Sequence, residues 1–228
     1  MKRGGQRGSV PLRVGASCAS FLGLVRSTTP KDLSGHCSRC LLRLEICICD
    51  ALPRVDTRLE VLIVQHVTEL RLTSNTGRLA ALALPKARIL EYGGGEPFDG
   101  NVLLSEPALL LYSPAAIVPA APVTAPPDVS KLVVLDGSFR QARRMYKRIA
   151  ALRALPELAL PPPRVAPNRL RQPPHAGGMS TLEAIAHALA LLEGEETAAP
   201  LHALQAEFVQ RMDTLRGRRR DELGRGVN

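Results

Sequence analysis

The chain has 228 residues, enough to bury one substantial core, and we expect a single domain with extensions. Thirty lysines and arginines outnumber 21 acidic residues, and the net charge of +9 suits a polyanionic partner such as nucleic acid. Tryptophan is absent and aromatic residues make up only 3%, so phosphate contacts must do more of the binding than base stacking.

No run of about 20 apolar residues could cross a bilayer, because prolines break the longest uncharged stretch, at 107–127. We therefore expect a soluble, cytoplasmic protein without a membrane partner. Residues 1–31 include basic residues and no acidic one, which predicts a disordered basic tail. A transit peptide fits less well, since its apolar core at 21–25 is short and no clear cleavage signal follows.

Four of the five cysteines form the pattern Cys37-x2-Cys40-x6-Cys47-x1-Cys49. No secretory signal precedes them, so metal ligation explains the pairs better than disulfides. Four thiolates favour tetrahedral zinc in a structural role, since no coordination position stays open. The alternative is buried structural thiols, because the one-residue spacing of the second pair departs from the common zinc-ribbon pattern. Cys18 lies in the tail and is expected to be an unpaired thiol.

Residues 59–65 predict a strand, and His66 and Glu69 follow just past its end. These two residues could act in catalysis, bind substrate or cap the loop. The stretch 73–78 is rich in hydrogen-bonding groups and opens a short helix over 79–84. Its backbone N–H groups could bind an anion, or the stretch could serve only as the N-cap.

Residues 88–90 and 108–111 predict two further strands, separated by the Gly93-Gly94-Gly95 turn. These glycines match neither a dinucleotide-binding nor a P-loop fingerprint, so they are weak evidence for phosphate binding.

Residues 132–135 are four branched aliphatics and predict a strand buried on both faces of a parallel sheet. Asp136 follows at the carboxyl end, the edge at which open α/β sheets bind ligands. Ser138 and Gln141 have the capping-box spacing, so a helix should begin at Ser138. One side of this helix is apolar and the other carries four basic residues, Arg140, Arg143, Arg144 and Lys147. The basic side either binds phosphates or is simply solvated.

Seven prolines predict a long irregular loop over 156–178. Ser180 and Glu183 again have the capping-box spacing and open the next helix. A final helix is expected over 200–216, before the basic residues 218–220. The alternation of strands and helices predicts the α/β class.

Five motifs in this order resemble the DTW-domain family over residues 37–192: the cysteine pattern, Thr73–Arg78, Leu135–Ala142, Arg169–Arg171 and Ser180–Ala184. The family's Asp-x-Thr-Trp reads Asp136-Gly137-Ser138-Phe139, which keeps the hydroxyl and a flat apolar ring but loses the indole N–H. Asn168 stands where members often carry tyrosine. The resemblance implies a largely parallel sheet flanked by helices and related to the trefoil-knot, SPOUT-like RNA methyltransferases.

We divide the chain accordingly into a basic tail (1–31), a four-cysteine zinc motif (32–58), the DTW catalytic domain (59–193) and a carboxy-terminal helix with a basic tail (194–228).

The resemblance also implies an activity. Such an enzyme would transfer the 3-amino-3-carboxypropyl group of S-adenosyl-L-methionine to N3 of a tRNA uridine and release methylthioadenosine. Asp136 would be the catalytic residue, either as general base or as the group that positions the acceptor. A carboxylate near a helix amino terminus is stabilised as the anion, which makes it a weaker base and keeps the positioning role open.

Two sets of further site residues follow from the resemblance and from the basic helix. The donor is expected to contact Leu135, Gly137, Ser138, Phe139, Ser180, Thr181 and Glu183. The tRNA is expected to contact Arg78, Arg140, Arg143, Arg144, Lys147, Arg169 and Arg171. The alternatives are an S-adenosylmethionine-dependent RNA methyltransferase and a non-catalytic, zinc-containing RNA-binding protein.

Overall fold

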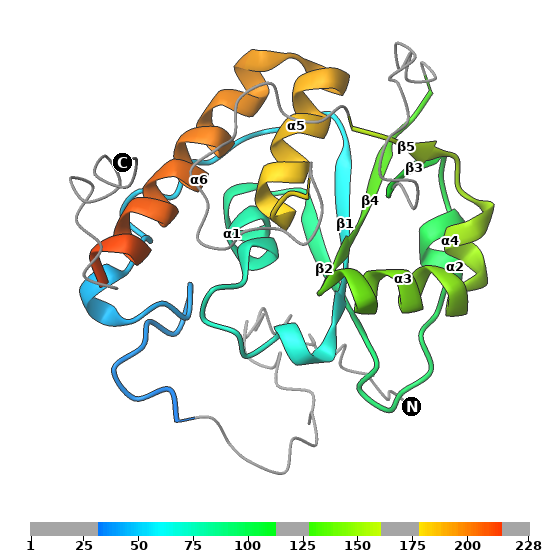
Figure 1. The fold of residues 1–228 in the computed structure, drawn as a ribbon. Coiled ribbons are helices and arrows are strands. Elements are labelled where there is room, and N and C mark those ends of the chain that lie inside the picture. Colours follow the sequence, from blue (N-terminus) through cyan, green and yellow to red (C-terminus); the bar gives the residue numbers. More distant parts are fainter. Residues whose placement is uncertain (1–31, 113–127, 161–177, 216–228) are drawn as a thin grey trace, which may run out of the picture.

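The computed structural model describes residues 32–112, 128–160 and 178–215. They build a five-stranded sheet, parallel throughout, in the order β2-β1-β4-β3-β5 (Figure 1). The strands are β1 (Glu60–His66), β2 (Ala87–Tyr92), β3 (Ala108–Leu111), β4 (Lys131–Asp136) and β5 (Glu157–Leu158). The predicted α/β class is confirmed. The relation to trefoil-knot enzymes stays a prediction.

Helices cover both faces of the sheet, as parallel strands with crossover connections require (Figure 1). One face packs against α1 (Thr76–Ala83), α5 (Thr181–Glu193) and α6 (Glu195–Leu215). The other packs against α2 (Asn101–Leu104), α3 (Phe139–Arg148) and α4 (Ala150–Ala154). Two short 3₁₀ helices are η1 (Leu44–Ile46) and η2 (Val67–Glu69).

The strand β1, which pairs with β2 and β4, shows why these residues form a sheet buried on both faces. Its side chains alternate, so Val61 and Ile63 join the core under α1 and α5, and Leu62 and Val64 join the core under α3. β4 alternates in the same way, with Val133 on the α3 side. The branched aliphatics at 132–135, predicted to form a strand buried on both faces, therefore do so in β4.

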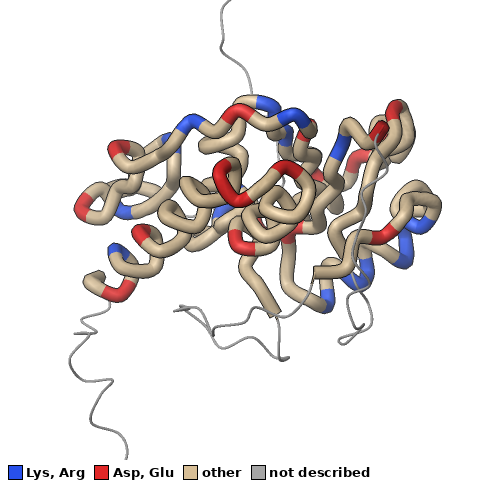
Figure 2. The backbone as a smooth tube through the Cα atoms, turned by 90° about the horizontal axis from the view of Figure 1, so that it is seen from above, with Lys and Arg blue, Asp and Glu red and all other residues tan. Residues whose placement is uncertain are grey.

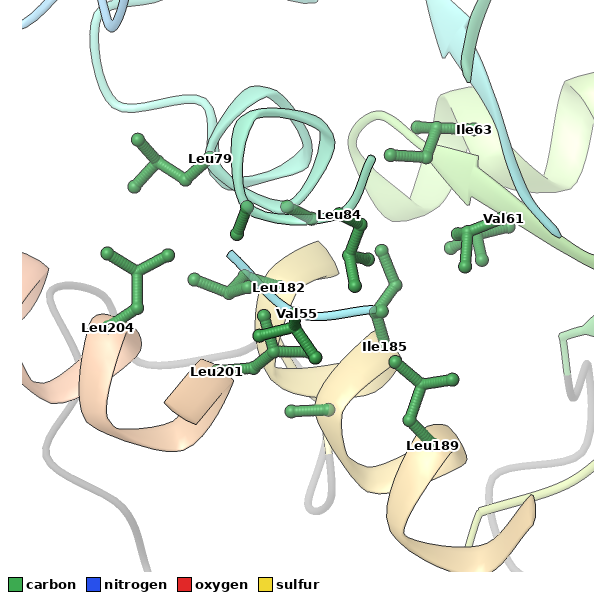
Figure 3. Packing of buried hydrophobic residues seen from close by; sticks show 14 of the residues in the cluster. Val55, Val61, Ile63, Leu79, Leu84, Leu182, Ile185, Leu189, Leu201 and Leu204 are labelled. Carbon is green, nitrogen blue, oxygen red and sulfur yellow. The ribbon is translucent and has the colours of Figure 1, made fainter. Parts of the chain in front are cut away.

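The larger core lies between the sheet and the α1, α5 and α6 layer. Figure 3 shows Leu182, Ile185 and Leu189 of α5 facing residues of α1, α6 and β1. All three are fully buried, and each such side chain contributes about 1.5–3 kcal/mol. This layer holds the amino-terminal end of α5 against the sheet, so that Thr181 lies beside the end of β4.

Several predicted boundaries need correction. The last helix begins at Glu195, not at residue 200, and contains Pro200 as its sixth residue. A proline there removes one hydrogen bond near the helix start, and burial of Leu201 and Leu204 offsets that loss. The predicted irregular loop is wrong at its beginning, where Glu157–Leu158 forms β5, and residues 161–177 lie outside the described ranges. The predicted tail at 1–31 lies outside them too.

Among the helices of the described ranges, none combines the length and apolar character needed to span a bilayer.

Candidate functional site

The connections that leave β1 and β4 run toward opposite edges of the sheet. From β1 it passes through α1 to β2, and from β4 it passes through α3 to the opposite side of the sheet. Because α1 and α3 cover opposite faces, the carboxyl ends of β1 and β4 border a topological switch point (Figure 1). The register there aligns Gln65 with Asp136.

Asp136 is the last residue of β4 and is 3% exposed. Its carboxylate accepts three side-chain hydrogen bonds. Gln65 Nε2 and Asn75 Nδ2 donate to Oδ2 at 2.6 and 2.7 Å, and Thr181 Oγ1 donates to Oδ1 at 2.5 Å. A carboxylate offers about four acceptor positions, so these contacts hold Asp136 in one orientation and leave one position on Oδ1.

The three donors come from separate elements, β1, the start of α1 and the start of α5. Asn75 is the N-cap of α1, and its Oδ1 accepts from the Arg78 N–H at 2.7 Å and from Gln65 Nε2 at 3.1 Å. The α5 start is tied to α1 through Leu182 N–H and Thr76 Oγ1, at 3.5 Å. The buried carboxylate thus joins the sheet to the amino-terminal ends of two helices. We call Gln65, Asn75, Asp136 and Thr181 the Asp136 cluster.

A second polar group lies on the α3 side of the same edge. His66 Nδ1 is 2.9 Å from Thr68 Oγ1 and 3.3 Å from Gln141 Nε2, and Gln141 Nε2 donates to Thr68 Oγ1 at 2.7 Å. We call these three residues the His66 cluster. Burial, and secondarily the positive charge of Arg144, lowers the pKa of His66 and favours the neutral imidazole.

Both predicted capping boxes are confirmed. Ser138 and Gln141 exchange the two capping hydrogen bonds at the start of α3, and Ser180 and Glu183 do so at the start of α5. These contacts account for the positions of all four side chains. Donor binding by Ser138, Ser180 and Glu183 stays a prediction.

The other residues predicted to contact S-adenosyl-L-methionine lie around Asp136. Leu135 packs against the α3-side core, and Thr181 bonds to the carboxylate itself. Gly137 lies close to Gln141 and His66, since an added Cβ would be 3.1 Å from Gln141 Cβ and 3.5 Å from His66 Cβ. Phe139, the first residue of α3, is 47% exposed and presents an aromatic ring beside the site.

The basic side of α3 is exposed along its length. Arg140, Arg143, Arg144 and Lys147 are all exposed, and none forms an ion pair within the described ranges. Figure 2 shows lysine and arginine positions gathered on the side of the molecule built by α3 and α4. This arrangement places unbalanced positive charge next to the switch point. It suits a polyanion that approaches from the α3 side.

Arg78 is situated differently from the arginines of α3. Its side chain is half-buried and donates to the Leu70 carbonyl. Burial lowers the pKa of Arg78, and the Asp136 carboxylate opposes that effect. Arg78 therefore fastens the loop before α1, and contact with tRNA is a prediction for it. Arg169 and Arg171 lie outside the described residues.

The four cysteines form the second candidate site. Sγ of Cys37 is 3.7 Å from Sγ of Cys49, Sγ of Cys40 is 3.8 Å from Sγ of Cys47, and all four sulfurs lie within 4.8 Å of one another. Sulfurs placed tetrahedrally about 2.3 Å from a zinc ion are about 3.8 Å apart, whereas a disulfide needs about 2.05 Å. The donor set and its spacing fit a structural zinc ion.

The surroundings of the sulfurs also suit a cation. Backbone N–H groups of Cys40 and Arg39 lower the pKa of Cys37 to about 6, so that thiol is readily ionised. Burial and the neighbouring cysteines raise the pKa of Cys49 to about 12. Thiolates so close together repel one another, and a divalent cation between them compensates their charge.

The cysteine motif is fastened to the last helix by Arg211. Its guanidinium pairs with Asp50 at 3.0 Å and with Glu207 at 2.6 Å and also donates to the Cys47 carbonyl. Cys40, Leu42 and neighbouring apolar residues share the core of α5 and α6. A metal bound here would stabilise the packing of α6 and, through α5, the Asp136 cluster.

Sequence reasoning missed Gln65, Asn75, Thr68 and Gln141 as members of polar clusters at the site. One available signal is Gln65 itself, a polar residue that directly follows the apolar run 61–64; in the structure its side chain is 0% exposed. Such a group must find a partner in the interior, because burying it alone is costly.

A doubly wound parallel sheet with a polar carboxyl-edge site defines the class of α/β proteins that bind ligands at a switch point. Within that class the chain belongs to the DTW domain family, whose model matches residues 34–213. A Drosophila melanogaster protein named tRNA-uridine aminocarboxypropyltransferase 2 is 29% identical over 192 residues, covering 78% of this chain and 76% of its own. A Macaca fascicularis protein of the same name is 27% identical, covering 77% of this chain and 64% of its own. No solved structure matches significantly.

Proposed function

We propose that the protein transfers the 3-amino-3-carboxypropyl group of S-adenosyl-L-methionine to N3 of a uridine in tRNA. The observation that carries this proposal is the position of Asp136, the first residue of the family motif. It lies buried at the switch point, beside the exposed basic side of α3. The names of the two relatives supply the reaction. A cytoplasmic enzyme acting on tRNA would also account for the net charge of +9.

The donor substrate carries a sulfonium, so displacement at its γ-carbon releases methylthioadenosine as a neutral thioether. The protein's contribution is orientation, because the carbon aligned with the acceptor nitrogen decides which group moves. The amino-terminal ends of α1 and α5 meet at Asp136, and the partial positive charge of such ends favours an anion such as the α-carboxylate of the methionine moiety of S-adenosyl-L-methionine. We assign the donor to this side of the sheet edge.

Asp136 then has two possible roles in the transfer. With three of its acceptor positions occupied, its carboxylate is held rigidly, which supports a positioning function for the Asp136 cluster. The fourth position, on Oδ1, is compatible with acceptance of the N3 proton. The basic side of α3 would hold the tRNA phosphates and bring the acceptor uridine to the same edge.

The decisive experiment is nucleoside mass spectrometry of tRNA incubated with the protein and S-adenosyl-L-methionine. We expect a uridine heavier by the aminocarboxypropyl group, with methylthioadenosine as the co-product. A methylated nucleoside with adenosylhomocysteine would establish the methyltransferase alternative. Bound tRNA with neither product and no donor affinity by calorimetry would establish a non-catalytic RNA-binding protein.

A further inference from the structure

We propose that His66 is a further acceptor-binding residue, whose Nε2–H donates a hydrogen bond to a ring carbonyl oxygen of the uracil that is modified. This inference rests on the proposed function and assigns the His66 cluster to the acceptor, on the opposite side of the sheet edge from the Asp136 cluster. Its evidence is the hydrogen-bond pattern around the imidazole, which fixes which ring nitrogen carries the proton.

The capping box of α3 fixes the orientation of the Gln141 amide. Gln141 Oε1 accepts from the Ser138 backbone N–H at 2.7 Å, and a backbone N–H can only donate. The other terminal atom of Gln141, Nε2, must therefore be the amide nitrogen. It faces Thr68 Oγ1 at 2.7 Å and His66 Nδ1 at 3.3 Å, to both of which it can only donate.

His66 Nδ1 consequently faces the amide N–H of Gln141, which favours an unprotonated Nδ1. The backbone N–H of Thr68 also points to Nδ1, at 3.3 Å, which makes the imidazole the side-chain cap of η2. Thr68 Oγ1 accepts from Gln141 and lies 2.9 Å from Nδ1, so its hydroxyl proton is free to turn toward an accepting Nδ1. A neutral imidazole with an accepting Nδ1 carries its proton on Nε2.

The Nε2–H is the one donor of this cluster with no hydrogen-bond partner among the described residues. His66 is half-buried, ends strand β1 and follows Gln65, which bonds to Asp136. The imidazole lies on the α3 side, where Gly137 and the basic side chains also lie. We expect tRNA held on α3 to bring its base to this side of the sheet edge.

The chemistry of N3 alkylation explains why a neutral hydrogen-bond donor beside the uracil would speed the transfer. The N3–Cγ bond forms while the Cγ–S bond breaks, its electron pair goes to the departing sulfur, and the N3 proton leaves to Asp136 or to water. Negative charge that builds up as the proton leaves spreads onto both carbonyl oxygens. A fixed N–H aimed at one of them stabilises this charge, and a neutral imidazole is known to serve as such an electrophile.

The test compares His66→Ala and His66→Gln under single-turnover conditions, with tRNA transcripts containing uridine or 5-fluorouridine. Loss of one such donor typically lowers a rate by about 100-fold or more. We expect that loss for His66→Ala at unchanged tRNA affinity, with partial recovery in His66→Gln, whose amide retains an N–H. Fluorine makes N3 more acidic, so the N3 anion of 5-fluorouridine needs less stabilisation by the protein. The loss of transfer rate in His66→Ala, relative to the wild type, should therefore be smaller with 5-fluorouridine than with uridine. The matched control is His187→Ala, which replaces a half-buried histidine that contacts His202 between α5 and α6.

Each outcome decides the question. A His66→Ala rate close to that of the wild type overturns the inference, and so does an equal deficit on both transcripts, because a purely structural effect does not depend on the acidity of N3. Lost tRNA affinity at an unchanged transfer rate would assign His66 to a phosphate instead. If the wild-type protein forms no aminocarboxypropyl product in the same assay, the proposed function itself fails, and this inference with it.

Discussion

Gly77 in the first turn of α1 lies directly against the Asp136 carboxylate. A Cβ added at Gly77 would be 2.8 Å from Asp136 Cγ and 2.8 Å from Oδ2. No side chain fits there without displacement of the carboxylate, and the backbone of α1 thereby forms one wall of the Asp136 cluster. A substitution at Gly77 can therefore displace the Asp136 carboxylate without changing its charge.

Gly77→Ala should lower the single-turnover transfer rate by about 10- to 100-fold, because displacements of about 1 Å near reacting groups have effects of that size. The carboxylate would have to move away from Gln65 and Asn75. Circular dichroism should still show a folded protein, since alanine favours the helix. Gly94→Ala is the matched control, because its nearest contact would be Val67 Cγ2 at 4.0 Å. A normal rate in Gly77→Ala would argue against any dependence of the reaction on the position of Asp136.

Asp136→Asn should both lower the melting temperature and slow the transfer. An asparagine has a single accepting oxygen, so at least one of the buried donors that bond to Asp136 would face an NH₂ group. An unsatisfied buried donor costs about 1–3 kcal/mol of stability. If Asp136 serves as base, the rate per folded molecule should also fall by about 10² to 10⁴.

Stability and chemistry are separated in that variant by measurement of the rate well below its melting temperature, with the folded fraction known. Thr181→Val is a useful companion, since it removes one hydrogen bond but keeps the negative charge. A destabilised Asp136→Asn protein with a normal rate per folded molecule would limit Asp136 to an architectural role.

The parts of the site that the sequence predicted are those set by short-range patterns. The capping boxes at Ser138 and Ser180 depend on residues three apart, and Asp136 is recognised because it ends an apolar run. The partners of Asp136 are 71, 61 and 45 residues away, in Gln65, Asn75 and Thr181. No local pattern pairs them, because the order of strands in the sheet decides which strand ends meet.

The missed elements have a similar explanation. α2 and β5 have four and two residues, too short for a hydrophobic period to register. β5 forms because its pairing with Leu110 and Leu111 of β3 supplies the hydrogen bonds and because Leu158 is buried. The sequence predicts the start of α6 at Pro200 and not at Glu195, because a proline usually marks the first turn of a helix.

Cys49→Ser should lower the zinc content from one ion per chain to near zero, because oxygen in place of a thiolate weakens a site built from four sulfurs. The melting temperature should fall as well, since Arg211 couples the cysteine motif to α6. Elemental analysis and differential scanning calorimetry measure the two effects, and Cys18→Ser is the control for loss of a thiol. Metal-free wild-type protein with four freely titratable thiols would contradict the zinc assignment.

The last prediction concerns the basic side of α3. Arg143→Ala combined with Arg144→Ala should weaken tRNA binding and reduce the slope of log affinity against log salt by about two, one for each lost phosphate contact. Lys86→Ala combined with Arg88→Ala removes the same charge from exposed residues at the amino end of β2, the opposite edge of the sheet from the site, and serves as the control. Binding titrations at several salt concentrations distinguish a local contact from a general effect of net charge. Equal losses in the two double variants would mean that only the overall charge matters. A loss confined to α3 would place the tRNA backbone beside the His66 cluster, in agreement with the proposed contact between His66 and the acceptor uridine.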